Sequence, residues 1–440
     1  MEEIEVNQSS ESKEEEQRVW SWGAGTDGQL GTGCLQDELS PQLLHLPFSI
    51  STLACGGAHV LALTSCGRVF SWGRGTSGQL GRGDMVNSSY LKPISFFDGY
   101  SVTQLSAGWS HSGFVSDSGC LFTCGDGSFG QLGHGDYSSY CSPVKVSYFT
   151  NNNVQQIACG MRHSLVLLKD CLGNQVYGFG SGKRGQLGIS KDKIRSVSLP
   201  QVTNGFEDVE IVGISANGDH SASLSANGHL YTWGKGFNKT SDSYIPQCLS
   251  SSLCFSKTAL GWNHTLLLTV TRLYMTCSWQ SSISVAGDGE VFMLGGSNHG
   301  VLSDPEKMSP AKPLSENSNE AALEKVSGLD DTKVVQIAAG AEHSALVTGN
   351  FQPSFFIYLS TYFSLAHLFS FLNAIADNGI IMTWGWGEHG QLGLGNTSDQ
   401  TKPKAVSLDD EVQSNDASFQ VYCGSGFTYA IRTLSLPSQT

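Results

Sequence analysis

Short apolar runs separated by polar turns recur along this 440-residue chain. Residues 60–63 (VLAL) and 69–72 (VFSW) are two such runs, joined by a polar segment that ends in Gly67. β-Favouring residues on both sides of a glycine at the reversal predict a β-hairpin. Glycines at positions 73, 75, 78, 81 and 83 disfavour a helix in the next segment. The predicted unit is therefore strand, turn, strand and glycine-rich loop.

Two sequence markers indicate that this unit occurs seven times. The first is of the Trp-Gly type and is found at Trp22-Gly23, Trp72-Gly73, Cys124-Gly125, Phe179-Gly180, Trp233-Gly234, Leu294-Gly295 and Trp384-Gly385. The second is Gly-x-x-His, which ends in His59, His111, His163, His264 and His343, with degraded copies that end in His220 and Phe427. A repeat of about 50 residues with four short strands is typical of a propeller blade, whose sheet buries its faces only against neighbouring blades.

The phase of the markers predicts how the ring closes. The chain begins with the second half of a unit, in residues 19–33, and ends with the first half of one, in residues 419–431. Pairing these halves would leave no open sheet edge. We therefore expect an all-β, seven-bladed propeller over residues 18–433, closed by pairing of the N- and C-terminal half-blades.

The charge pattern adds two short tails and excludes some partners. Residues 1–17 contain seven Glu and one Lys and are expected to form an acidic disordered tail; residues 434–440 form a second tail. The net charge of −14 disfavours direct binding to nucleic acid or anionic lipid. Cys55, Cys159 and Cys423 share one repeat position, so they are interpreted as small buried apolar residues of a cytoplasmic or nuclear protein.

Two stretches break the repeat at the same hairpin turn of two blades. They are residues 270–286 and 349–376, of 17 and 28 residues. The second contains 22 residues without a formal charge, at 355–376, which is long enough to span a bilayer. A single crossing would place paired strands on opposite sides of the membrane, so no membrane span is expected. Codons for Gly349-Asn350 and Ala376-Asp377 can contain splice junctions, and residues 349–376 are interpreted as translated intron sequence; residues 270–286 are a weaker candidate.

The motifs that suggest chemistry have structural explanations. The spacing Gly23-x-Gly25-x-x-Gly28 matches a dinucleotide-binding fingerprint, but three more blades repeat it without a following helical pattern, which indicates turn geometry. One histidine per blade indicates a packing and hydrogen-bonding role, which we assign to His59, His111, His163, His220, His264 and His343, and we assign the marker tryptophans Trp22, Trp72, Trp233 and Trp384 to structure as well. No catalytic, cofactor or metal site is predicted, and the chain is not expected to be an enzyme.

Trp109 and Trp262 each follow the marker glycine of their blade. Such residues fill space between blades, or they form a surface aromatic anchor for a partner. They are the candidate partner-binding residues.

The units GGAHVLALTSCGRVFSWGRGTSGQLGRG and GWSHSGFVSDSGCLFTCGDGSFGQLGHG resemble repeats of the regulator-of-chromosome-condensation family. The resemblance implies a seven-bladed propeller with a split closing blade. One branch of that family exchanges nucleotide on the GTPase Ran and has a basic tail. Another branch senses ultraviolet-B light in plants through repeated Gly-Trp-Arg-His-Thr segments. Here only Trp109 and Trp262 match that Trp, and Ser110 or Asn263 stands where the segment has Arg.

Three functional hypotheses follow. The first is a monomeric, non-enzymatic scaffold that binds partner proteins through loops on one face. The second is a guanine nucleotide exchange factor for a small GTPase. The third is a signalling protein like the plant ultraviolet-B receptor, although the chain resembles a plant relative of that receptor without its chromophore.

Overall fold

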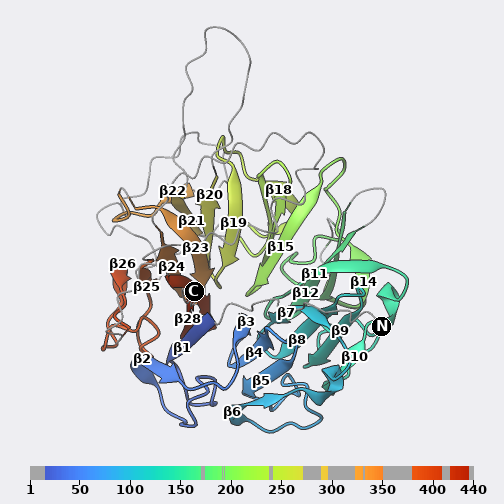
Figure 1. The fold of residues 1–440 in the computed structure, drawn as a ribbon. Coiled ribbons are helices and arrows are strands. Elements are labelled where there is room, and N and C mark those ends of the chain that lie inside the picture. The colour runs from blue at the N-terminus through green and yellow to red at the C-terminus, as the bar shows by residue number, and fades with distance from the viewer. Residues whose placement is uncertain are drawn as a thin grey trace, which may run out of the picture.

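The computed structural model describes residues 15–169, 174–190, 192, 194–236, 241–270, 289–295, 323–330, 332–349, 379–408 and 417–435. These residues form seven four-stranded sheets arranged as blades around a central axis (Figure 1). Neighbouring strands within each sheet are antiparallel. The predicted seven-bladed propeller is confirmed.

Six blades are continuous in sequence, and each runs from an innermost to an outermost strand. Blade 1 contains β3 (Ile50–Cys55), β4 (His59–Thr64), β5 (Val69–Gly73) and β6 (Ser88–Pro93); blade 2 contains β7 (Val102–Ala107), β8 (His111–Ser116), β9 (Leu121–Gly125) and β10 (Tyr140–Lys145). Blade 3 contains β11 (Asn153–Cys159), β12 (His163–Lys169), β13 (Gln175–Ser181) and β14 (Ser196–Val202); blade 4 contains β15 (Ile211–Asn217), β16 (His220–Ser225), β17 (Leu230–Gly234) and β18 (Ser243–Cys248). Blade 5 contains β19 (Phe255–Leu260), β20 (His264–Thr269), β21 (Val291–Gly295) and β22 (Leu323–Lys325); blade 6 contains β23 (Val334–Ala339), β24 (His343–Thr348), β25 (Ile381–Gly385) and β26 (Gln400–Ala405). Single 3₁₀ turns, η1 (Ser95–Phe97) and η2 (Ser147–Phe149), follow blades 1 and 2.

The seventh blade is a composite of both ends of the chain. Its strand order is β2 (Glu38–Leu44), β1 (Glu15–Gly23), β28 (Phe427–Ser435) and β27 (Ala417–Cys423). β1 and β28 pair over nine residues, from Glu15 opposite Ser435 to Gly23 opposite Phe427. The predicted closure by half-blades is therefore confirmed. The strands also extend into both expected tails, because residues 15–17 and 434–435 are paired.

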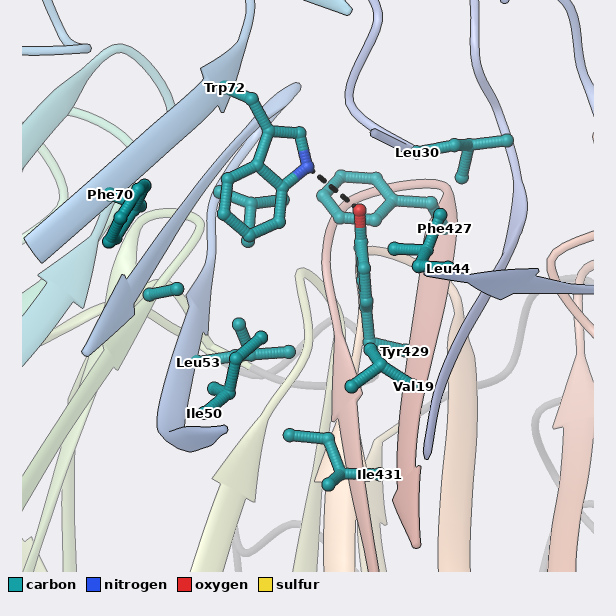
Figure 2. Packing of buried hydrophobic residues seen from close by; sticks show 12 residues of the cluster. Val19, Leu30, Leu44, Ile50, Leu53, Phe70, Trp72, Phe427, Tyr429 and Ile431 are labelled. Atoms are coloured by element: carbon teal, nitrogen blue, oxygen red, sulfur yellow. Dashed lines mark hydrogen bonds between the residues drawn. The ribbon is translucent and has the colours of Figure 1, made fainter. Parts of the chain in front are cut away.

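Apolar side chains pack between blades. The second strand of a blade is buried along its whole length, as in β4 and β12 up to Leu168. Between the composite blade and blade 1, Val19, Phe427 and Ile431 pack against Leu53 and the other members of one buried cluster (Figure 2). Because each sheet buries its faces only against its neighbours, no blade is expected to be stable alone.

A buried hydrogen-bond motif joins the glycine-rich loop of one blade to the next blade. The carbonyl of Gln79 accepts a 2.7 Å bond from Ser112, and the carbonyl of Gln131 accepts a 2.8 Å bond from Ser164. The marker tryptophans donate to the same type of carbonyl, with Nε1 bonds from Trp22 to Gln391, from Trp72 to Gln29 and from Trp233 to Gln186 at 3.0, 3.2 and 2.9 Å. This motif fixes each Gln-Leu-Gly loop against the following blade.

The motif changes where the ring closes. In blade 1, Val60 occupies the position of the serine and has no hydroxyl. Tyr429 of the composite blade supplies one instead: its Oη donates to the Gln29 carbonyl at 2.7 Å and accepts from Trp72 Nε1 at 2.8 Å (Figure 2). The carbonyl is therefore satisfied by a residue from the other end of the chain.

A second substitution matches the first. Five marker histidines, His59, His111, His163, His264 and His343, each bond the hydroxyl that follows the next marker, as in the 2.9 Å contact of His59 Nε2 with Ser112 Oγ. At the closure, Phe427 replaces the histidine and Val60 replaces the hydroxyl, and both are fully buried in one apolar cluster. The histidine–hydroxyl pair is thus replaced at the closure by the apolar pair Phe427 and Val60.

This pairing predicts strong coupling between the two positions. Val60→Ser and Phe427→His should each destabilise the fold by about 2–4 kcal/mol, because each leaves a buried polar group facing an apolar side chain. The double variant should recover about 1–2 kcal/mol of the summed loss by rebuilding the histidine–hydroxyl bond. Urea unfolding of the four proteins measures the coupling. Strictly additive losses would show that the two positions are not partners.

The predictions about the inserts lie outside the described residues. Residues 271–288 and 350–378 contain nearly all of both segments, including the apolar stretch at 355–376. Residues 1–14 of the acidic tail also lie outside. In the part of the chain that the structure describes, no helix is long and apolar enough to cross a membrane.

Candidate functional site

A channel runs along the propeller axis. The innermost strands of the blades line a cavity of about 310 Å³, whose walls include Gln104, Gln156 and Ser215. Near one end of this channel lie the loops that join the first and second strands, which carry the Gly-x-x-His markers. We call this end the marker mouth.

Backbone hydrogen bonds join the marker loops of neighbouring blades around this mouth. The residue after each marker glycine donates to the next blade, in the pairs Gly57–Gly108, Trp109–Gly160, Met161–Gly218, Trp262–Ala341, Ala341–Ser425 and Ser425–Gly56, at 2.8–3.2 Å. Between blades 4 and 5, the degraded marker residue Asn217 bridges instead, because its Nδ2 donates to the Leu260 carbonyl at 2.6 Å. The marker loops thus form a belt that holds their side chains in fixed positions.

Trp109 and Trp262 meet at the marker mouth. They come from blades 2 and 5, on opposite sides of the ring, yet their ring centroids are 5.0 Å apart with an interplanar angle of 50°. Both side chains are half-buried and both line the channel. The two candidate partner-binding residues therefore form one aromatic contact across the channel, which the sequence spacing did not indicate.

Charged side chains surround this aromatic pair. The guanidinium carbon of Arg74 lies 5.6 Å from the Trp109 ring centre, and Arg74 Nε is buried without a hydrogen-bond partner. On the other side, Lys235 Nζ donates to Asn263 Oδ1 at 2.8 Å, and Asn263 Nδ2 donates to a Glu342 carboxylate oxygen at 3.0 Å. The mouth thus combines an aromatic centre with a cation on one side and a hydrogen-bonded Lys-Asn-Glu chain on the other.

The sequence interpretation missed these four polar residues, although the repeat contained a signal for them. Arg74 and Lys235 directly follow a Trp-Gly marker, and Asn263 and Glu342 stand two positions after a marker glycine. Residues at one repeat phase lie on one face of a propeller. A search by phase would therefore have found them.

The marker histidines are buried and electrically neutral at pH 7. Burial is the main cause that lowers their pKa from 6.5, to about 3 for His59, His163, His220 and His343 and to about 4 for His111 and His264. The Ser112 hydroxyl donates to the Gln79 carbonyl, so it must accept its second bond from His59 Nε2. The ring therefore carries its proton on Nε2 and its lone pair on buried Nδ1.

The same tautomer argument applies to His111, His163 and His343, whose hydroxyl partners Ser164, Ser221 and Thr428 also donate to glutamine carbonyls. These side chains join neighbouring blades. Among the described residues, no group of three His, Cys, Asp or Glu could hold a metal ion.

The three cysteines at one repeat position are free thiols. Burial raises the pKa of Cys159 and Cys423 to about 12, and it also raises that of Cys55 well above its usual value. A thiol with so high a pKa is a poor nucleophile at neutral pH. These residues therefore fill space beside the channel.

Comparison with known proteins identifies the fold's family. The RCC1-like domain model matches residues 18–353, and the model of the regulator of chromosome condensation (RCC1) repeat matches residues 378–431. The chain is 27% identical over 405 residues to the ultraviolet-B receptor UVR8 of Arabidopsis thaliana, covering 90% of this chain and 78% of the receptor. It is 28% identical over 427 residues to the secretion-regulating guanine nucleotide exchange factor of Bos taurus, covering 90% and 80%.

A solved structure gives the same architecture. Prp20p of Saccharomyces cerevisiae, described with its binding properties to Gsp1p and histones, matches with a TM-score of 0.71 at 23% identity, covering 96% of this chain and 92% of Prp20p. At that identity the likeness establishes the fold. Because the RCC1-like domain model covers most of the chain and an RCC1 repeat follows it, this protein belongs to the family of regulator-of-chromosome-condensation repeat proteins.

Proposed function

We propose that this protein is a non-enzymatic scaffold that binds a partner protein at the marker mouth. The contact between Trp109 and Trp262, with Arg74 beside it, is the observation that carries the proposal. Tryptophan and arginine are the residue types that contribute most often to binding hot spots, especially near the centre of an interface. A half-buried aromatic pair held by a rigid belt also loses little conformational entropy when a partner binds.

The proposal includes the absence of enzymatic activity. The six marker histidines are buried and neutral, and five of them bond a hydroxyl of the next blade. General acid–base catalysis needs a group that reaches the substrate and has a pKa near the working pH. A binding role requires neither. We further propose a monomer in the cytoplasm or nucleus, since its twelve cysteines show no paired spacing.

Nucleotide exchange on a small GTPase is the second candidate function. It is supported by the 28% identity to the secretion-regulating guanine nucleotide exchange factor and by the fold shared with Prp20p. A GTPase would then be the partner, and the same face would contact it. The two candidates differ in whether nucleotide controls the complex.

Affinity purification from native tissue with paired variants tests the proposal. Trp109→Ala/Trp262→Ala should lose the proteins that the wild type retains, because it removes the aromatic centre. Tyr90→Ala/Tyr137→Ala is the matched control, since both tyrosines are exposed aromatic residues outside the channel lining, 62% and 52% accessible. The control should retain the same proteins, and all variants should melt within a few degrees of wild type.

The outcomes separate the hypotheses. Equal retention by the tryptophan variant and wild type would refute binding at the marker mouth. A GTPase that is retained in nucleotide-free buffer and released by GTP would favour exchange activity over a passive scaffold.

Light should not change the oligomeric state. The ring contacts of Trp109 within the described residues involve Trp262 and Arg74, and Ser110 and Asn263 stand where the receptor-type repeat has arginines. We therefore expect the same elution volume in size-exclusion chromatography before and after ultraviolet-B irradiation. A dimer that dissociates on irradiation would restore the photoreceptor hypothesis.

A further inference from the structure

The glycine-rich loop of blade 3 is basic although the protein is acidic. Residues 181–196 contain five Lys or Arg and one Asp, whereas the whole chain has 25 Lys or Arg and 39 Asp or Glu. The structure describes Lys183, Arg184 and Arg195 of this loop, and all three are exposed. An isolated basic segment on an acidic protein is a specific local feature of the charge distribution.

Backbone hydrogen bonds bring a fourth cation to the same place. Ser181 N–H donates to the Arg162 carbonyl at 2.8 Å, and Gly182 N–H donates to the Arg195 carbonyl at 3.1 Å. These two hydrogen bonds join the marker loop, the start of the glycine-rich loop and the end of that loop. We call Arg162, Lys183, Arg184 and Arg195 the basic rim. Arg162 directly precedes β12, and Arg195 directly precedes the outer strand β14 of the same blade.

Two cations of the basic rim are held in place by neighbours. The guanidinium carbon of Arg162 lies 5.0 Å from the Phe129 ring centre, a residue of blade 2. Arg184 forms a 3.1 Å ion pair with Asp242 of blade 4. The basic rim therefore spans from blade 2 to blade 4, and it is partly ordered before any partner binds.

Three cations of the basic rim, Arg162, Lys183 and Arg195, are available for an ion pair with a partner. Three neighbouring carboxylates are engaged, since Asp219 accepts from Gln186, Asp242 pairs with Arg184 and Asp126 accepts from Ser128 and Gln131. Asp192, in the loop itself, is exposed and forms no ion pair among the described residues. Within the described parts of the chain, no carboxylate lies at ion-pair distance from Arg162, Lys183 or Arg195. Exposed guanidinium groups without an ion-pair partner bind carboxylates through paired N–H donors.

We infer that the basic rim binds a carboxylate-rich segment of the partner protein while the tryptophan pair binds an apolar part of it. This inference rests on the proposed function and gives the partner's chemistry. Charge complementarity selects an acidic peptide over a nucleic acid, because the net charge of −14 repels a polyanion that extends beyond the rim. Phe129 adds an apolar surface beside Arg162 that suits a peptide side chain.

Fluorescence anisotropy with a defined probe tests the basic rim. The probe is a fluorescein-labelled eight-residue peptide of alternating Glu and Ser, compared with the same peptide in which Gln replaces every Glu. Wild type should bind the Glu peptide with an affinity that falls as salt rises. Arg162→Glu/Lys183→Glu/Arg195→Glu should bind it at least about tenfold more weakly, since three attractive charges become repulsive.

Lys92→Glu/Lys402→Glu/Lys404→Glu is the matched control. These exposed lysines of β6 and β26 give the same change in net charge at other places. The control should bind the Glu peptide within about twofold of wild type. Equal weakening by both triple variants, or equal binding of the Gln peptide, would overturn the inference. A phosphoserine peptide that binds at least about tenfold tighter than the Glu peptide would overturn the assignment to carboxylates.

The test separates this inference from the proposed function. The basic-rim variant could retain every protein that the tryptophan variant loses in affinity purification. That result would refute binding of a carboxylate-rich segment at the basic rim and would support partner binding at the marker mouth. If the Glu peptide binds as described while the tryptophan variant loses no protein, the basic rim stands and the marker mouth is not the partner site.

Discussion

The propeller should unfold cooperatively when the pH is lowered from 7 to 5, with an uptake of about six protons. The six marker histidines have pKa values of about 3 to 4 in the folded state, against 6.5 in an unfolded chain. Below pH 6.5 the unfolded state therefore binds more protons, and the free energy of unfolding falls as the pH falls. The effect is absent above pH 7 and is complete only near the folded pKa values.

The expected size of this effect is large. At pH 5 each histidine contributes a loss of about 2 kcal/mol, because pH 5 lies about 1.5 units below 6.5 and one unit corresponds to 1.36 kcal/mol. Six such losses are of the order of 10 kcal/mol, comparable to the whole stability of a typical domain of about 5–15 kcal/mol. Carboxylates hardly titrate in this range, so the histidines dominate the pH dependence.

Thermal unfolding by circular dichroism at half-unit steps from pH 7.5 to 5 measures this loss, and calorimetry in buffers of different ionisation enthalpy counts the protons. Replacing His163 by Asn should reduce the uptake by about one proton at pH 5. Replacing the half-exposed His389, which is not one of the six buried histidines, is the control for the substitution itself. A melting temperature that is constant from pH 7 to 5 would contradict the neutral, buried state of the histidines.

Deleting residues 417–440 should abolish the folded propeller. This deletion removes β27 and β28, and β28 lies between β1 and β27 in the composite blade. It removes Phe427, Tyr429 and Ile431 from a buried cluster and takes the hydroxyl from the Gln29 carbonyl. Each buried aromatic residue alone is worth about 3–5 kcal/mol, so the total loss exceeds the usual stability of a domain.

Two further measurements make this test specific to closure. Deleting only residues 436–440 removes no strand residue, since β28 ends at Ser435, and should leave the melting temperature unchanged. Adding a peptide of residues 417–440 to the truncated chain should restore cooperative melting. A truncated protein that is monomeric and melts like wild type would mean that the composite blade does not hold the ring closed.

The composite blade shows which features of the fold local sequence can predict. The two markers predicted seven units and a split blade because the repeat spacing is a property of the chain itself, and strand and turn preferences are local. The same spacing predicted one buried histidine in each of six blades. The markers identified Phe427 as a degraded copy, but they did not single out Val60. Only their adjacency across the closure shows that each substitution explains the other.

The sequence by itself determined the blade count, the repeating strand–turn–strand unit and the composite closure, because all three follow from apolar runs and marker spacing along the chain. The tertiary structure decided the functional surface. Trp109 and Trp262 lie 5.0 Å apart because a closed ring brings opposite blades to one axis, and no local pattern encodes that distance. Arg162 and Arg195 likewise meet through hydrogen bonds of the folded backbone. Contacts between distant residues depend on how the ring closes, so only the folded structure could place them.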